Sequence, residues 1–93
     1  MNLPTDYTKL NAKQKAEVRQ QYMELQDHKC YYCNEPLDKP APQRIRQYAL
    51  NLRLFPPGFL KHPVHLQHNH NTNMTEGAVH AYCNGYMWQY KGR

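Results

Sequence analysis

The chain has 93 residues and a formal net charge of +5, from 12 Lys and Arg against seven Asp and Glu. This length suits one compact domain, residues 1–93, and excludes an arrangement of two ordinary domains. No stretch approaches the ~20 apolar residues of a membrane span, and the first residues show no signal-peptide pattern. Three cysteines, an odd number, argue against a disulfide framework, so we expect a reduced, cytoplasmic protein.

The supply of core-forming residues is thin. Leu, Ile, Val and Phe make up 15 of the 93 residues, under the ~20 % level below which disorder becomes a serious alternative. Eight Tyr, four Met and one Trp offset part of this deficit because they bury large areas. A core this lean benefits from a covalent or metal staple, so the composition favours a metal site.

The positive charge is unevenly placed along the chain. From Lys39 through Thr75 there is no Asp or Glu, and Glu76 is the only acid from residue 39 onward. Such a stretch repels itself unless it faces an anion, most commonly nucleic acid phosphate; a solvated basic surface explains it equally well. The residues expected to contact DNA phosphates are Arg44, Arg46, Arg53, Lys61, Lys91 and Arg93.

The first predicted element is a helix over residues 11–26, with Asn11 as its N-cap. Apolar side chains recur at helical spacing along it. These are Ala16, Val18, Tyr22 and Leu25. We expect a packing helix whose outer face is solvated, in preference to a helix that reads DNA.

The remaining elements are shorter, and Pro, Gly and Asn residues mark their ends. In chain order we predict a tight turn at 30–33, a basic connecting segment at 39–61 with a short helix at 43–52, a strand at 64–68, a turn-rich loop at 70–77, a returning strand at 78–80, and a helix from 83 to 91 stopped by Gly92. For the last helix we expect its aromatic residues, Trp88 above all, to pack in the core rather than to stack on bases.

Two segments of identical spacing, Cys30–Cys33 and His80–Cys83, predict a zinc site. Two residues between ligands allow a tight turn to direct both toward one ion, and no thioredoxin-like pattern favours redox chemistry instead. The predicted ligand set is Cys30, Cys33, His80 and Cys83. An ordinary histidine at position 80 is the alternative, in which case His62 or His65 is the next candidate for the fourth ligand.

Together with this pattern, the sequence after residue 64 resembles the HNH endonucleases, most closely those of phages and bacteria of the endonuclease VII type. The resemblance covers under half of the chain. It is carried by Cys30–Cys33, by Leu66-Gln67-His68-Asn69-His70-Asn71-Thr72 and by Gly77-Ala78-Val79-His80-Ala81-Tyr82-Cys83-Asn84, with Trp88 and Tyr90 beyond. It implies an α+β fold in which an N-terminal helix precedes a small zinc-stapled, treble-clef-like ββα-metal unit over 64–91.

The resemblance also implies roles for single residues. His68 matches the general base that deprotonates the attacking water, and Asn84 matches the helix residue that holds a catalytic divalent ion. Gln67 stands where the family has Asp or His as the other ligand. The implied activity is that of a metal-dependent DNA endonuclease or nickase with a structural Cys₃His zinc. A domain of this reach needs a second copy or a partner protein to cut both strands.

Gln67 is where the chain departs from the family. Its amide carries no charge, whereas a hard ion such as Mg²⁺ prefers charged oxygens. We therefore expect weak metal binding, with a preference for Mn²⁺, Co²⁺ or Ni²⁺ if His70 or His65 joins the site. Three interpretations of Gln67 are open. Gln67 binds the catalytic ion, a neighbouring histidine binds it instead, or the protein is a non-catalytic zinc module that binds nucleic acid. A zinc-stabilised adaptor that binds another protein is the third possibility.

Overall fold

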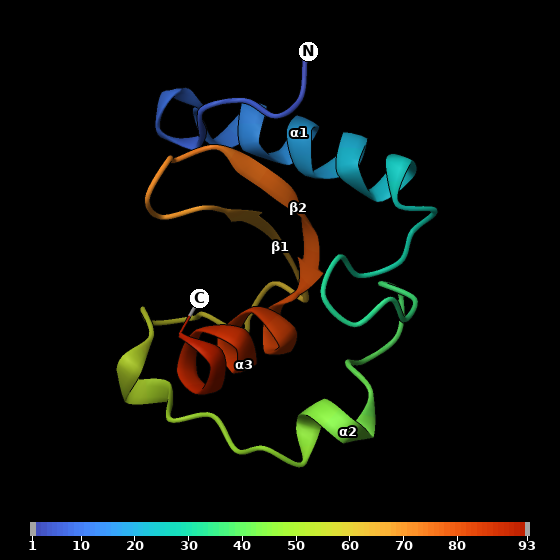
Figure 1. Cartoon of the computed structure of the whole chain (residues 1–93), viewed down its shortest axis with the longest axis vertical. Helices are drawn as coiled ribbons and strands as arrows, with labels where there is room; N and C mark the ends of the chain where they lie inside the picture. The colour runs from blue at the N-terminus through green and yellow to red at the C-terminus, as the bar shows by residue number, and fades with distance from the viewer. Residues whose placement is uncertain (1, 93) are drawn as a thin grey trace.

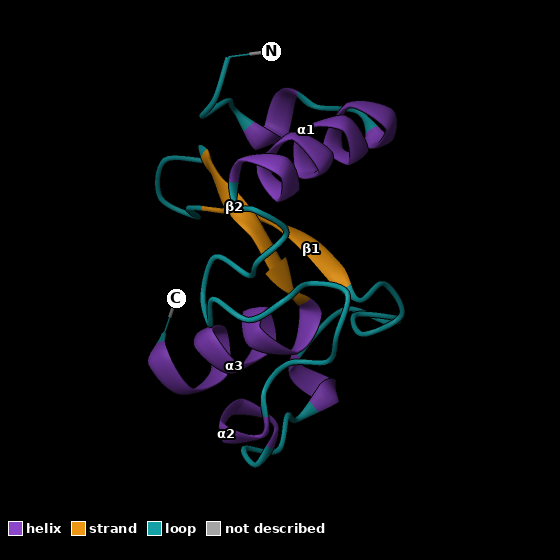
Figure 2. Cartoon of the chain, turned by 90° about the vertical axis from the view of Figure 1, so that its right-hand side faces the viewer, coloured by secondary structure: helices purple, strands orange, loops and turns teal. Residues whose placement is uncertain are grey.

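Two antiparallel strands lie between a long N-terminal helix and a C-terminal helix in the computed structural model, which describes residues 2–92 (Figure 1). The view at right angles shows the same order, with α1 at one end and α3 at the other (Figure 2). None of the helices in this described range has the length and apolar character that a bilayer crossing requires. The elements are α1 (Ala12–Leu25), α2 (Gln43–Arg46), β1 (Val64–His68), β2 (Thr75–His80) and α3 (Ala81–Lys91), with 3-10 turns η1 (Tyr7–Lys9) and η2 (Leu52–Leu54).

Helix α1 begins where the sequence predicts, because Asn11 and Gln14 form a reciprocal capping box. Its buried face is narrower than the apolar spacing suggests. Val18 and Tyr22 are buried against the strands, whereas Ala16 and Leu25 are exposed, which corrects that part of the prediction.

The strand over 64–68 is confirmed, but its partner starts at Thr75 rather than at residue 78. The predicted loop is therefore shorter. The N-terminal segment explains the extension: the Thr75 backbone N–H donates to the Thr5 carbonyl, and the Thr75 hydroxyl accepts from the Thr5 N–H. The N-terminal segment, which is distant in sequence, thus supplies hydrogen-bond partners to the start of β2. A bulge at Gln67/His68 shifts the register where β1 ends.

Helix α2 ends after four residues, so the predicted helix over 43–52 is mostly wrong. The carbonyl groups of residues 46, 48 and 49, which a continued helix would use, instead accept hydrogen bonds from α3. The Tyr82 hydroxyl donates to the Tyr48 carbonyl at 2.8 Å, and the Tyr90 hydroxyl donates to the Ala49 carbonyl. Tertiary contacts therefore hold this segment in an irregular path beside α3.

Helix α3 starts two residues earlier than predicted, with His80 as its N-cap, and Gly92 ends it in the left-handed conformation as expected (φ 69°). The buried residues of α3 are the small ones, Ala81, Cys83 and Gly85. Trp88 is 44 % exposed, so the expectation that it packs in the core is wrong.

A side-chain amide joins α1 to β2 in place of a third strand. Gln26 accepts a hydrogen bond from the Ala78 N–H and donates to the Ala78 carbonyl, both at 2.8 Å. The Tyr31 N–H donates to the same carbonyl at 2.9 Å. Gly77 makes this approach possible, since a Cβ there would lie 2.7 Å from Gln26 Oε1 and 2.9 Å from the Tyr31 ring.

We expect Gly77→Ala to destabilise the protein by about 1–3 kcal/mol, because the added methyl must displace both Gln26 and Tyr31. Gly85→Ala is the comparison: its Cβ would meet the flexible end of Leu50 at 2.8 Å and the Phe59 ring at 3.2 Å, while Ala favours the helix. Urea unfolding of both variants measures the difference. Equal stability of wild type and Gly77→Ala would contradict the tight approach described here.

Candidate metal centre and adjoining cavity

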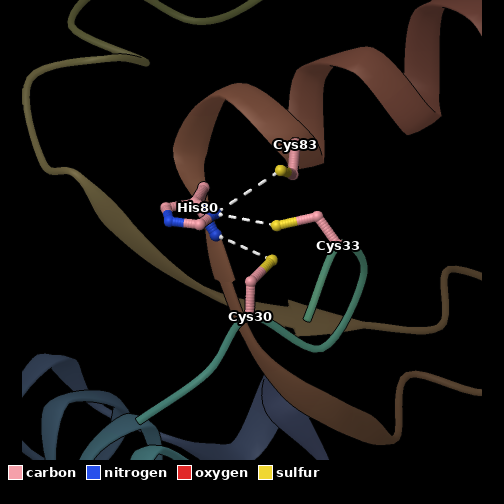
Figure 3. Close-up of side chains that lie close together, drawn as sticks. All are labelled: Cys30, Cys33, His80 and Cys83. Atoms are coloured by element: carbon pink, nitrogen blue, oxygen red, sulfur yellow. Dashed lines mark hydrogen bonds between the residues drawn. The ribbon is translucent and has the colours of Figure 1, made fainter. Parts of the chain in front are cut away.

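Four side chains from the two predicted segments meet in the interior (Figure 3). Their ligand atoms all lie within 4.8 Å of one another, and all four residues are buried. They are Cys30, Cys33, His80 and Cys83. Among residues 2–92 this is the one such gathering of three or more His, Cys, Asp or Glu ligands. A tetrahedral zinc with bonds of ~2.0–2.3 Å needs ligand separations of roughly 3.3–3.8 Å, so the group can hold such an ion.

The imidazole of His80 is oriented for ligation through one nitrogen. Its Nδ1 lies 3.3 Å from Cys33 Sγ and 3.5 Å from Cys83 Sγ. Its Nε2 lies 2.9 Å from the carbonyl oxygen of Pro36. A proton on Nε2 donates to that carbonyl, which leaves the Nδ1 lone pair facing the sulfurs. Histidine ligands of metals are commonly fixed in this way by a hydrogen bond from the other ring nitrogen.

The three thiols influence one another strongly. A hydrogen bond from Cys83 lowers the pKa of Cys30 to about 4, and further bonds from backbone N–H groups of the knuckle, residues 30–33, and of His80 add to this effect. The same hydrogen bond and burial raise the pKa of Cys83, while burial raises the pKa of Cys33. A buried thiolate beside two further thiols and an imidazole is a donor set suited to a soft or borderline dication such as Zn²⁺.

Local backbone geometry brings the sulfurs together. In the knuckle the Asn34 N–H donates to the Cys30 carbonyl, and Asn34 has φ of 63°, which turns the chain back on itself. His80 ends β2, and Cys83 lies in the first turn of α3. Because the strand passes directly into the helix, the spacing 80–83 places both side chains on the same side.

Beside this centre lies a cavity of about 550 Å³, which we call the β1 cavity. Its walls come from α1, from β1, from the segment after η2, and from α3. The predicted catalytic residues His68 and Asn84 both line it, as do Gln67 and His70. A pocket of this size is in the range of ligand-binding sites. The fold therefore places the strand-end histidine and the helix asparagine on one concave surface.

His68 is held from one side by an aromatic ring. Tyr7 stacks on its imidazole with ring centroids 4.0 Å apart and an angle of 12° between the planes. Burial lowers the pKa of His68, and the neighbouring His70 and Lys15 lower it further, while Glu76 opposes them. The imidazole therefore remains neutral, and able to accept a proton, at a lower pH than an exposed histidine.

Asn84 pairs with a histidine rather than with Gln67. Asn84 Nδ2 lies 3.2 Å from His65 Nδ1, while the Gln67 amide donates to the His68 carbonyl at 2.8 Å and lies 3.5 Å from Glu76 Oε1. Burial lowers the pKa of His65, so its ring is also held neutral. The oxygen and nitrogen donors of Asn84 and His65 suit a borderline divalent ion better than Mg²⁺.

His70 and Glu76 line a second groove, of about 330 Å³, which shares Gln67, His68 and Trp88 with the β1 cavity. The rings of His70 and His68 lie 4.6 Å apart. Among the described residues, Cys30, Cys33, His80 and Cys83 are the one cluster of His, Cys, Asp or Glu side chains that could hold a metal ion. His68, His70 and Glu76 therefore do not form a second such cluster. His70 borders the β1 cavity as a neighbour of His68.

The predicted phosphate-binding residues do not form one patch with the cavity. Arg44 donates to the Cys33 carbonyl at 2.8 Å and pairs with Glu35, and Arg46 donates to the Ala41 carbonyl, so both brace the knuckle and its connection. None of the predicted basic residues is among those that line the β1 cavity within the described chain. Exposed positions are Arg44, Arg46, Arg53, Lys61 and Lys91, and Arg93 lies outside the described residues.

Two cations of α1 that are outside the predicted set line the β1 cavity instead. These are Lys15 and Arg19. Lys15 also lies over the Tyr7 ring, 4.3 Å from its centroid. The sequence offers one indication of this placement, because residues 15 and 19 are one helical turn apart and lie close to the buried Val18. Only the packing of α1 on β1 shows that both side chains face the cavity.

Comparison of the chain with protein-family models, with curated proteins and with solved structures finds no match.

We expect the purified protein to contain one zinc per chain, and His80→Ala to lose it together with cooperative folding, because metal binding and folding are coupled. His62→Ala is the control, since His62 is exposed and stands outside the four-residue group. Elemental analysis and thermal unfolding with and without a chelator measure both effects. Zinc loss in His62→Ala but not in His80→Ala would contradict the ligand assignment.

Proposed function

We propose that the protein is a metal-dependent DNA endonuclease or nickase of the HNH type, in which β1, β2 and α3 form the ββα-metal unit. The observation that carries the proposal is that His68 and Asn84 border one cavity beside a group able to hold zinc. The resemblance of the segments around these residues to HNH endonucleases gives the two side chains their roles.

His68 acts as general base in this proposal. Its neutral imidazole removes a proton from water, the water oxygen forms a bond to phosphorus, and the bond from phosphorus to the leaving oxygen breaks. The Tyr7 ring fixes the plane of the imidazole from one side. Lys15 and Arg19 hold the negative phosphate in the cavity by charge–charge attraction. General-base catalysis by a positioned side chain contributes about 10²–10⁴-fold.

The described residues fit a divalent ion in the β1 cavity only in part. The Asn84 amide oxygen, after rotation of the amide, and the His65 Nδ1 atom would hold it, because these groups lie next to each other. Such an ion, when bound, neutralises charge on the phosphate and stabilises the leaving alkoxide. Gln67 is engaged with the His68 carbonyl. Of the three interpretations that the sequence leaves open, the one in which a histidine takes the ligand role of Gln67 therefore has the best geometric support, and that histidine is His65.

A non-catalytic, nucleic-acid-binding zinc module is the second candidate. It is favoured by the uncharged ligands near His68, since no carboxylate lines the β1 cavity among the described residues. In that case Lys15 and Arg19 would bind phosphate with no hydrolysis. Cleavage assays separate this candidate from the first.

We expect plasmid DNA to be nicked or cut in the presence of Mn²⁺, Co²⁺ or Ni²⁺, more slowly with Mg²⁺, and His68→Ala to reduce the rate by at least about 100-fold. His62→Ala, on the rim of the same cavity, should keep most of the activity. Gel electrophoresis of a time course measures both. A wild-type protein inert with every ion tested, or a His68→Ala protein of equal rate, would reject the catalytic assignment.

The two cations of α1 that line the cavity give a separate prediction. Replacing Lys15 and Arg19 together by Gln should weaken DNA binding and reduce its salt dependence by a slope of about two, because two phosphate contacts are lost. Replacing Arg44 and Arg46 by Gln removes equal charge away from the cavity. Titrations at several salt concentrations compare the two. An equal loss in both variants would show that only net charge matters.

A further inference from the structure

Trp88 occupies an unusual position for the only tryptophan of a chain so poor in apolar residues. It is 44 % exposed, and it lines both the β1 cavity and the second groove. An exposed aromatic ring in the wall of a cavity is available to contact a bound ligand. Nothing in the packing of α3 requires an indole here, because the buried residues of that helix are small.

Trp88 is the outer end of a row of rings that leads to the candidate catalytic residues. Its ring meets the edge of Phe55 at 5.4 Å, Phe55 stacks on Phe59 at 4.5 Å, and Phe59 meets His65 edge-on at 4.8 Å. His65 in turn contacts Asn84. We call this row, Trp88, Phe55, Phe59 and His65, the aromatic ladder. It runs continuously from the surface to the place where the proposed function locates the phosphate.

The charges around the ladder select an anion. Lys15 and Arg19 line the same cavity, and no Asp or Glu does so among the described lining residues. Aromatic rings interleaved with cations are typical of surfaces that bind single-stranded nucleic acid, where rings stack on bases and cations follow the phosphates. A purely apolar partner would leave both cations without a counter-charge.

Stacking on Trp88 requires a base with a free face. Inside a duplex both faces of each base are covered by neighbouring bases, so a paired base reaches the ring only after unstacking, which costs a few kcal/mol. A single strand offers its bases without that cost. The ladder therefore discriminates by the pairing state of the DNA and not by its sequence, since every base has a π-face.

We propose that Trp88 and the aromatic ladder form a stacking site for an unpaired base, so that the preferred ligand is single-stranded DNA or an unpaired segment within a duplex. This inference rests on the proposed function in taking DNA as the ligand, and it names the class of DNA structure that the site receives. The base stacks on Trp88 while the adjoining phosphate lies near Lys15 and Arg19.

Because the chain has a single tryptophan, its fluorescence reports on this site alone. The zinc-loaded, full-length protein is titrated with a strand of about 15 nucleotides, or with the same strand annealed to its complement, in low salt without added Mn²⁺, Co²⁺, Ni²⁺ or Mg²⁺ so that no cleavage occurs. We expect the single strand to quench Trp88, and the duplex to need at least about tenfold higher concentration.

Variants identify the ring as the cause. Trp88→Ala should bind a dye-labelled single strand about 5- to 100-fold more weakly, and Trp88→Phe should keep most of the affinity because it keeps a stacking face. Leu25→Ala, which removes an apolar side chain that is more exposed than Trp88 and lies at the C-terminal end of α1, should bind like wild type. Zinc content and circular dichroism verify that each variant is folded.

The stacking proposal and the nuclease proposal fail in different ways. Quenching by single strands without cleavage under any ion supports stacking and rejects catalysis. Cleavage of duplex DNA without quenching leaves the nuclease in place and overturns the stacking site. Equal affinity for single strand and duplex, or unchanged binding by a folded Trp88→Ala, also overturns it, and no binding to either DNA at low salt rejects both.

Discussion

The structure depends on the meeting of two sequence-distant pairs of ligands around one point. The sulfurs of the knuckle and the 80–83 pair lie within 4.8 Å of one another, although about fifty residues separate them in the chain. The buried core beside them contains few large side chains. Apart from the ligand group, the Tyr31 N–H donates to the Ala78 carbonyl, and Cys30 and Cys33 pack with Ala78 and Val79 of β2. A dication held by four ligands has the strength to fix this arrangement where apolar burial is scarce.

The ligand group also sets the position of the candidate catalytic surface. His80 ends β2, and α3 starts at the next residue, so the direction of α3 is fixed where the ligands converge. Asn84 follows the last ligand directly and is carried on the same helix. On the other strand, the pairing of β1 with β2 places His68 at the hairpin end. The candidate metal site and the cavity thus belong to one short unit, in which the cavity residue Asn84 follows the ligand-type residue Cys83.

The N-terminal segment and α1 complete the cavity from the outside. Tyr7 stacks on His68, and Lys15 and Arg19 supply the cations that the basic segment 39–61 does not bring to this place. Gln26 ties the C-terminal end of α1 to Ala78 of β2 by two hydrogen bonds, and Val18 and Tyr22 pack into the core with Ala78 and Val79. Trp88 is not part of this core and is partly exposed. The interior is closed by small residues and ligands, so the large ring is free to face a partner.

The sequence by itself determined the features that depend on local chemistry: the capping box of α1, strand 64–68, the stop at Gly92 and the two ligand pairs, because each is encoded within a few residues. The tertiary structure alone decided the rest. The start of β2 depends on Thr5, the end of α2 on tyrosine hydroxyls from α3, and the exposure of Trp88 on how little volume the core requires. The lining of the cavity by Lys15, Arg19 and Tyr7, and the pairing of Asn84 with His65 in place of Gln67, arise from the packing of distant elements, which no local pattern specifies.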